Sequence, residues 1–190
     1  MIDHGVVWIT GLSGAGKTTV AHLVRDRLTA TGRRPVVVDG DRMRELLPVP
    51  LGYAETDRRK LAGYYGRLAQ ELASQGHLVL CATVSMFHEA REWNRANIPG
   101  YFEVWLQVPM RELTTRKGRA AFYGPDRIET DVVGVDTSAE YPTTADLVID
   151  NFHPTSATDA ADAICAALGQ ASGSQNSAAV MNRGDRVPTG

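Results

Sequence analysis

The stretch GLSGAGKTTV, residues 11–20, follows the apolar run Val6–Ile9. It contains the pattern G-x-x-x-x-G-K-[S/T], which is typical of loops that bind nucleotide phosphates. The apolar run predicts a buried strand, and the residues from Lys17 onward carry apolar side chains at helical spacing. A strand, a glycine-rich loop and a helix in this order predict a P-loop NTPase fold. A chance glycine turn is the alternative.

The predicted loop works through its backbone and two side chains. Glycines let the chain turn its N–H groups toward the phosphates, and the following helix adds its positive N-terminal end. Lys17 would place a cation near the β- and γ-phosphates, and the Thr18 hydroxyl would ligate Mg²⁺. The expected cofactors are therefore ATP and Mg²⁺, with Thr18 as the metal ligand. The predicted cofactor-binding residues are Gly11, Ser13, Gly14, Ala15, Gly16, Lys17, Thr18 and Thr19.

Strand-like and helix-like segments alternate along the rest of the chain. This alternation predicts an α/β fold with a five-stranded parallel sheet and helices on both faces, in which ligands lie at the carboxyl ends of the strands. We expect Asp57 to cap the second long helix, whose apolar stripe includes Leu61 and Tyr65. Residues 1–168 are predicted to form one P-loop kinase domain. The Gly-, Ser-, Asn- and Ala-rich residues 169–190 are predicted to be a disordered tail. The expected strands cover 6–10, 35–38, 77–84, 101–108 and 147–149.

Composition narrows the classes of partner. The formal net charge of −2 gives no general attraction to nucleic acid or acidic membranes, and no apolar run is as long as a membrane span. Cys81 and Cys165 lie in apolar surroundings and are predicted to be buried free thiols, which fits the reducing cytoplasm. We therefore expect a cytoplasmic protein whose partner is a small molecule.

Two acids follow the second predicted strand, as Asp39-Gly40-Asp41. The guanine-reading motif of switch GTPases is not found, and the third strand ends without the acid that motor ATPases carry. One acid could orient or deprotonate an acceptor hydroxyl, and the other could hold a water on Mg²⁺. Asp41, Asp39 and Lys17 are thus the predicted catalytic residues of a small-molecule kinase. An ordinary turn with a helix cap is the alternative for the two acids.

Several cations flank this region and suggest an anionic acceptor. The alternative is that they belong to solvated helix faces, an interpretation that we favour for Arg59 and Lys60. The cations are Arg42, Arg44, Arg58, Arg59 and Lys60.

The motifs GLSGAGKTT, DGDRMR, LGYAETDR and VSMF together resemble the adenylylsulfate (APS) kinases, colinearly from about Val6 to Leu168. That family phosphorylates the 3′-hydroxyl of APS with MgATP. The resemblance implies that Tyr53 stacks on the acceptor base and that Ser85 contacts the acceptor, although Ser85 could instead cap a helix before Phe87. The predicted substrate-binding residues are Arg44, Tyr53, Arg58, Val84, Ser85, Lys117 and Val132.

The departures from the family pattern bear on the acceptor. Leu61 replaces an asparagine that lies near the acceptor in the family, and we expect Leu61 in the core. The predicted mobile lid, with Arg116 and Lys117, is two residues shorter than the family's and would close over the transferring phosphate. Val132 replaces a second aromatic residue over the adenine. Stacking on one ring is worth about 1–3 kcal/mol, so affinity for APS would fall by one to two orders of magnitude.

The stretches SMFHEAREWNRANIP and VVGVD resemble a divergent branch of the family that includes cytidine diphosphoramidate kinase. We therefore predict an ATP-dependent kinase that acts on a nucleotide hydroxyl, expected to be the ribose 3′-OH. The acceptor is APS-like or a CDP derivative. A true adenylylsulfate kinase of sulfate activation and a non-catalytic nucleotide-binding regulatory module are the alternatives. The resemblance also suggests a homodimer.

Overall fold

A parallel sheet organises the protein, and its strand order is β2-β3-β1-β4-β5. The computed structural model describes residues 5–116, 123 and 131–180. All four pairs of neighbouring strands run parallel, which confirms the predicted α/β fold and its five-stranded sheet. The strands are β1 (Gly5–Thr10), β2 (Val36–Asp39), β3 (Leu78–Ala82), β4 (Tyr101–Gln107) and β5 (Leu147–Asp150).

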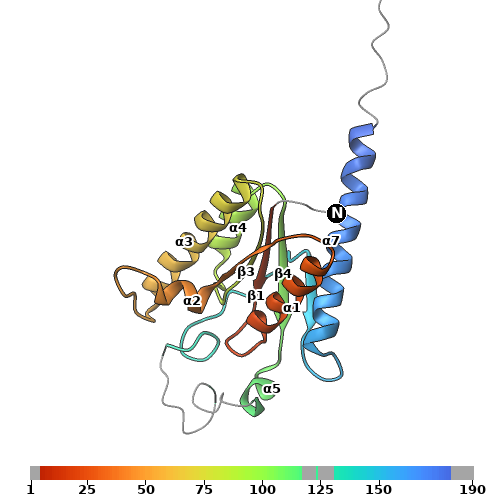
Figure 1. Ribbon diagram of the computed structural model, residues 1–190. Helices are drawn as coiled ribbons and strands as arrows, with labels where there is room; N and C mark the ends of the chain where they lie inside the picture. Colours follow the sequence, from red (N-terminus) through yellow and green to blue (C-terminus); the bar gives the residue numbers. More distant parts are fainter. Residues whose placement is uncertain (1–4, 117–122, 124–130, 181–190) are drawn as a thin grey trace, which may run out of the picture.

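Helices cover both faces of this sheet (Figure 1). One face packs against α1 and α7, and the other packs against α3 and α4. The short helices α2 and α5 lie near the edge of the sheet where the strands end. The helices are α1 (Lys17–Ala30), α2 (Gly40–Glu45), α3 (Glu55–Ser74), α4 (His88–Asn97), α5 (Met110–Thr115) and α7 (Ala157–Val180).

The central strand β1 shows how the two cores are separated. All six of its residues are buried. Val7 and Ile9 point into the core beneath α1 and α7, whereas Val6 and Trp8 point into the core beneath α3. Successive side chains of a strand alternate between faces, so a strand covered on both sides must be apolar throughout. Burial of this strand fixes the start of the glycine-rich loop that follows it.

Three local features differ from the sequence-based expectation. Helix α3 begins at Glu55 with Ala54 as its N-cap, so Asp57 is not the cap; its carboxylate accepts a bond from the Gly52 amide at 3.0 Å. The six-residue helix α2 was not expected, because so short a segment has no periodic stripe. Cys81 is buried as expected, whereas Cys165 is only half-buried.

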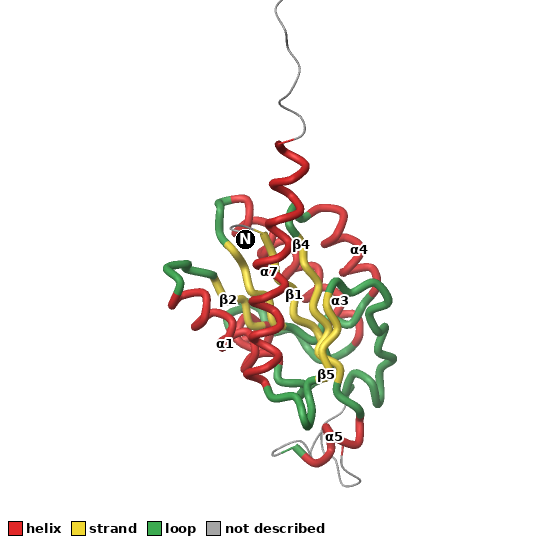
Figure 2. The backbone as a smooth tube through the Cα atoms, turned by 90° about the vertical axis from the view of Figure 1, so that its right-hand side faces the viewer, coloured by secondary structure: helices red, strands yellow, loops and turns green. Residues whose placement is uncertain are grey.

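The last helix runs further than the predicted domain boundary at Leu168. Helix α7 continues to Val180 and projects past the end of the sheet that lies opposite the glycine-rich loop (Figure 2). Its alanine-rich first half packs against α1, and a helix that has started adds further residues at little cost. Helix α7 thus includes residues 169–180 of the predicted tail, and the domain boundary at Leu168 stays a prediction. Residues 181–190 of the predicted tail lie outside the described part of the chain.

Candidate active site

The loop between β1 and α1 has the backbone conformation that its glycines predict. Gly14 and Gly16 have φ values of +80° and +92°, a left-handed region that L side chains adopt only with strain. At the root of the loop, a Cβ on Gly11 would lie 2.6 Å from the Leu106 carbonyl oxygen. Only glycine fits these positions, so the loop geometry depends directly on the motif.

The first residues of α1 place the two functional side chains of the loop. The Lys17 ammonium donates to the Leu12 carbonyl at 2.9 Å, so it lies across the loop. The Thr18 hydroxyl donates to Asp39 Oδ2 at 2.6 Å, which joins the start of α1 to the end of β2. A hydroxyl and a carboxylate beside a phosphate loop are oxygen ligands of the kind that Mg²⁺ prefers. The residues present therefore fit a Mg²⁺–nucleotide complex.

The two acids after β2 have different surroundings. Asp39 Oδ1 accepts bonds from the amides of Asp41 and Arg42, each at 3.1 Å, so Asp39 caps α2 while its other oxygen binds Thr18. The helix-cap alternative is thus correct for Asp39. The exposed Asp41 carboxylate lines the cavity described next and makes no hydrogen bond or ion pair to any residue that the structure describes. Asp41 is therefore the acid that is available to a ligand.

A cavity of about 570 Å³ opens beside the loop, at the carboxyl ends of β1, β2 and β3. It brings together most of the predicted site residues from six separate stretches of chain. Gly11 and Ala15 are not part of its wall because both are buried beneath the loop. The predicted residues that line it are Ser13, Gly14, Gly16, Lys17, Thr18, Thr19, Asp39, Asp41, Arg44, Tyr53, Arg58, Val84, Ser85, Arg116 and Val132.

Two arginines lie against one aromatic ring on the side of the cavity away from the loop. The guanidinium carbons of Arg44 and Arg58 are 4.5 and 5.3 Å from the centre of the Tyr53 ring. Arg44 Nη1 also donates to the carbonyls of Leu51 at 2.9 Å and Gly52 at 2.7 Å. A guanidinium has five N–H donors, so it can hold this turn and still bind an anion. Burial, followed by the nearby Arg44 charge, lowers the pKa of Arg58.

The floor of the cavity is formed by buried polar groups. Ser85 has a φ of +20°, and its hydroxyl lies 2.8 Å from the Thr83 hydroxyl. Ser85 does not cap the following helix, because the N-cap of α4 is Phe87, whose own side chain makes no cap hydrogen bond. Tyr65 donates to the Gly40 carbonyl at 2.7 Å, and burial raises the pKa of its phenol to about 12. Leu61 is buried as expected and also lines the cavity.

Asn151, which follows the outer strand β5, and Arg116, which follows α5, both support the loop. The Asn151 amide donates to the Ala15 carbonyl at 2.7 Å, and Arg116 Nη1 donates to the Gly14 carbonyl at 2.7 Å. Arg116 also donates to the Asn151 carbonyl. No motif marks Asn151 in the sequence, although its place directly after β5 puts it at the edge of the sheet that bears the loop. Lys117, which is predicted to form the lid together with Arg116, lies outside the described residues.

Several other charged residues lie outside this cavity. Lys60 is exposed and pairs with Asp57 at 3.2 Å, and Arg42 is exposed and pairs with Glu45 at 2.6 Å. Arg59 differs from the expected solvated side chain, because it packs over the Phe87 ring at 4.4 Å and pairs with Glu140 at 2.8 Å. The acceptor side of the cavity therefore holds two of the five predicted cations.

The fold and this loop define a P-loop kinase, and comparison with known proteins identifies the family. The adenylylsulphate kinase family matches residues 3–150. A cytidine diphosphoramidate kinase of Campylobacter jejuni is 35% identical over 147 residues, which are 77% of this chain and 85% of that protein. A probable adenylyl-sulfate kinase of Bacillus subtilis is 32% identical over 166 residues, covering 86% and 83% of the two chains.

A solved structure is also similar. The Mycobacterium tuberculosis APS kinase CysC, in complex with AMPPNP and APS, has a TM-score of 0.79 and 31% identity, over 88% of this chain and 98% of that one. The chain belongs to the adenylylsulphate kinase family. It is an ATP-dependent phosphotransferase. Within the described residues, no helix has the length and apolar character needed to cross a membrane.

Proposed function

We propose that this kinase transfers the γ-phosphoryl group of ATP to a ribose hydroxyl of a nucleotide whose anionic linkage binds Arg44 and Arg58. The observation that carries the proposal is the placement of these two arginines on one tyrosine ring in the cavity wall. Two cations this close repel each other, and an anionic ligand would relieve that repulsion. Tyr53 would support the acceptor base.

The donor would lie on the glycine-rich loop. The backbone amides of 13–18 and the Lys17 ammonium would bind its phosphates, and Thr18 would hold Mg²⁺ with Asp39 behind it. Bound there, Mg²⁺ would offset the negative charge of the β- and γ-phosphates. Arg116 donates to the Gly14 carbonyl and also lines the cavity, and its closing over the transferring phosphate stays a prediction.

Asp41 would orient the acceptor hydroxyl and accept its proton. Its carboxylate is exposed and lines the cavity, and Asp41 lies on α2 between Asp39, which binds Thr18, and Arg44. Asp39 is already used by Thr18 and by two amides, so it acts through position rather than as the base. A positioned base typically contributes about 10²–10⁴-fold to the rate.

We propose a cytidine nucleotide of the CDP-phosphoramidate type as the acceptor. Among the described aromatic residues that line the cavity, Tyr53 is the exposed one, whereas Val132 is buried where the family pattern has a second ring. A pyrimidine offers less surface for stacking than adenine and loses less when one ring is replaced by valine. The similarity to the Campylobacter enzyme supports this choice.

Adenylyl sulfate is the second candidate acceptor, supported by similarity to the Bacillus and Mycobacterium kinases. A kinase assay with MgATP, read by mass spectrometry, separates the two candidates. The panel would contain APS, CDP-phosphoramidate, CDP and AMP, each at low concentration. Phosphorylation of a cytidine nucleotide with APS inert would support the proposal, and efficient phosphorylation of APS would overturn it. A homodimer and a cytoplasmic location stay predictions.

A further inference from the structure

The segment 131–141 forms one wall of the cavity, although it contains neither a helix nor a strand of the sheet. Val132 and Val133 are buried and line the cavity. Within the segment, an isolated bridge joins Val133 to Thr137, and the Gly134 amide donates to the Thr137 carbonyl at 2.8 Å. Regular structure therefore does not hold this wall in place, and contacts from other elements must do so.

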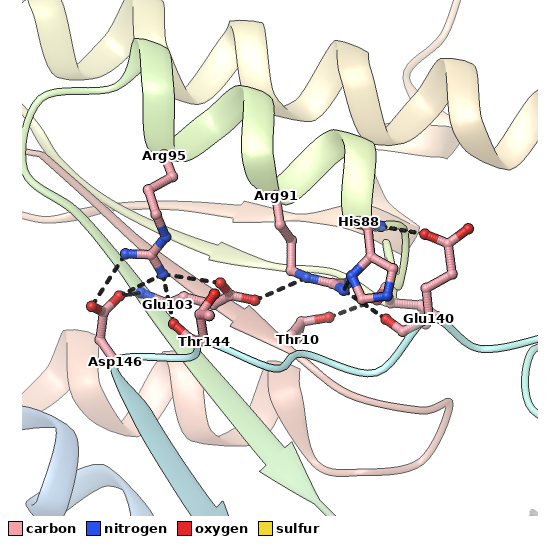
Figure 3. Close-up of polar contacts among 9 residues, drawn as sticks. Thr10, His88, Arg91, Arg95, Glu103, Glu140, Thr144 and Asp146 are labelled. Carbon is pink, nitrogen blue, oxygen red and sulfur yellow. Dashed lines mark hydrogen bonds and ion pairs between the residues drawn. The ribbon is translucent and has the colours of Figure 1, made fainter.

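Glu140 connects the wall to three other parts of the fold. Its Oε1 accepts from Arg59 Nη2 at 2.8 Å, and its Oε2 accepts from the backbone amide of His88 at the start of α4. Its carbonyl accepts from Arg91 Nη2 at 2.7 Å. Its own amide donates to the Met86 carbonyl at 3.1 Å. Figure 3 shows Glu140 below the first turn of α4, with His88 and Arg91 directed toward it.

The other end of the wall, at Asp131, is held by α3, the helix that also carries Arg59. Arg58 donates through Nη2 to the Asp131 carbonyl at 2.8 Å and through Nε to the Tyr53 carbonyl at 2.7 Å. Arg58 and Arg59 are adjacent on α3, so consecutive residues of one helix hold the two ends of 131–141. A shift of the wall at Glu140 would therefore also move the Asp131 carbonyl and the Arg58 side chain that binds it, and Arg58 lines the cavity.

The Glu140 contacts are strong because they involve an ionised carboxylate. Partial burial opposes ionisation, but the His88 amide and Arg59 outweigh it, and the pKa of Glu140 is lowered. The Glu140 side chain is 26% exposed and that of Arg59 is 36% exposed, so water screens the pair only in part. Hydrogen bonds to an ionised partner are shorter and stronger than neutral ones.

We propose that Glu140 is a positioning residue for the acceptor half of the site, which fixes 131–141 against α3 and α4 and so sets the places of Val132 and Arg58. Neither Glu140 nor Arg59 lines the cavity, so Glu140 acts through the wall rather than by touching a substrate. The acceptor half is the part of the cavity lined by Arg44, Tyr53, Arg58 and Val132. Its role in binding the acceptor belongs to the proposed function, and the inference rests on that function. The expected consequence is an effect on acceptor affinity that is separate from ATP affinity.

Steady-state kinetics of Glu140→Ala and Glu140→Gln would test this inference. The acceptor would be whichever nucleotide of the panel the wild-type protein phosphorylates. We expect Glu140→Ala to raise the acceptor KM about tenfold, within the range that misplaced positioning groups produce, and to leave the ATP KM within about twofold. Glu140→Gln keeps one of the two acceptor oxygens, so it can accept from either Arg59 or His88, and its effect should be smaller than that of alanine.

Glu71→Ala is the matched control, because Glu71 is an exposed glutamate of α3 that bonds to Gln75 and lies outside the cavity. It should behave as wild type in both KM values. An equal rise in the two KM values of Glu140→Ala would indicate general loosening and overturn the inference. An unchanged acceptor KM would overturn it as well. Should the alanine variant fail to fold, the same criteria apply to Glu140→Gln.

Hydrogen exchange separates this inference from the proposed function, because it needs no turnover. In Glu140→Ala, the amides of 131–141 should exchange about tenfold faster than in wild type, while those of the glycine-rich loop and β1 exchange at the same rate. If the wild-type protein phosphorylates no nucleotide of the panel, the proposed function is wrong, and exchange alone decides on Glu140. Equal exchange of 131–141 in variant and wild type would then overturn the inference.

Discussion

The donor and acceptor halves of the cavity are built in different ways. The donor half is a single stretch, residues 11–19, whose shape is set by backbone conformation at Gly14 and Gly16. The acceptor half draws on α2, α3, the exit of β3 and the segment 131–141, which are joined by side-chain bonds to carbonyls. The local motif tolerates few substitutions, because few residues can adopt its backbone conformation. A wall assembled from distant segments can acquire a new specificity through a few substitutions.

The strongest expected effect is that of Asp41, whose exposed carboxylate lines the cavity. Asp41→Asn should lower kcat by about 10²–10⁴-fold, because the amide cannot accept the proton of the acceptor hydroxyl. ATP affinity, measured by titration with a non-hydrolysable analogue, should stay within about threefold, since the loop is intact.

Glu45→Gln is the control for Asp41, because Glu45 belongs to the same short helix and is exposed in a pair with Arg42. It should keep wild-type turnover. Equal losses of turnover and ATP affinity in Asp41→Asn would remove Asp41 from its catalytic role and place it in the donor half.

Gly16→Ala should damage the donor half alone. The left-handed backbone costs about 1–3 kcal/mol for a residue that has a Cβ, and that Cβ would lie 2.7 Å from Asn151 Nδ2. We expect ATP affinity to fall by about tenfold or more and the free energy of unfolding to fall as well, measured by analogue titration and urea denaturation.

Gly32→Ala separates strain from site damage. Gly32 has a similar φ of +87°, and a Cβ there would meet nothing within 4 Å. This variant should lose stability without losing ATP affinity. Weakened ATP binding in Gly32→Ala would mean that helix α1, rather than the loop shape, controls the donor half.

Tyr53→Ala should damage the acceptor half alone. Removing a ring that stacks on a base typically costs about 1–3 kcal/mol, so the acceptor KM should rise about five- to 150-fold. The ATP KM should hardly change, because the ring lies on the arginine side of the cavity. Tyr53→Phe keeps the ring and should stay close to wild type; a large effect of this substitution would shift the role of Tyr53 from stacking to its hydroxyl.

The donor half could be predicted from the sequence because its information is local. The motif, the strand before it and the helix after it occur within residues 6–30, and the structure has all three. The fold followed from the same kind of signal, since each strand is a short apolar run. At the C-terminus the two signals differ: the composition of 169–180 predicts a disordered tail, whereas helix α7 continues through these residues from its packed start.

The acceptor half could be predicted only in part, because its geometry depends on contacts across the chain. No period predicts how 131–141 runs, since the segment is held by Arg58, Arg59 and the start of α4. Arg59 was interpreted as a solvated residue because its partner Glu140 is 81 residues away. Asn151 was overlooked for the same reason, as its bond to Ala15 spans 136 residues.

The smallest expected effect concerns the support of the donor loop by β5. Asn151→Ala removes the bond from Nδ2 to the Ala15 carbonyl and should lower the free energy of unfolding by about 1–3 kcal/mol, because a buried acceptor loses a partner. The ATP KM should rise severalfold, measured by steady-state kinetics, while the acceptor KM stays within about twofold. This pattern is the reverse of that expected for Tyr53→Ala.

Asn97→Ala is the matched control, because Asn97 is an exposed asparagine of α4 whose amide bonds to the Trp93 carbonyl. It should leave both KM values unchanged. If Asn151→Ala raised the acceptor KM as much as the ATP KM, the two halves would be coupled through β5 and the loop. The two halves would then not bind their ligands independently, since the one hydrogen bond from Asn151 to Ala15 would control both ATP affinity and acceptor affinity.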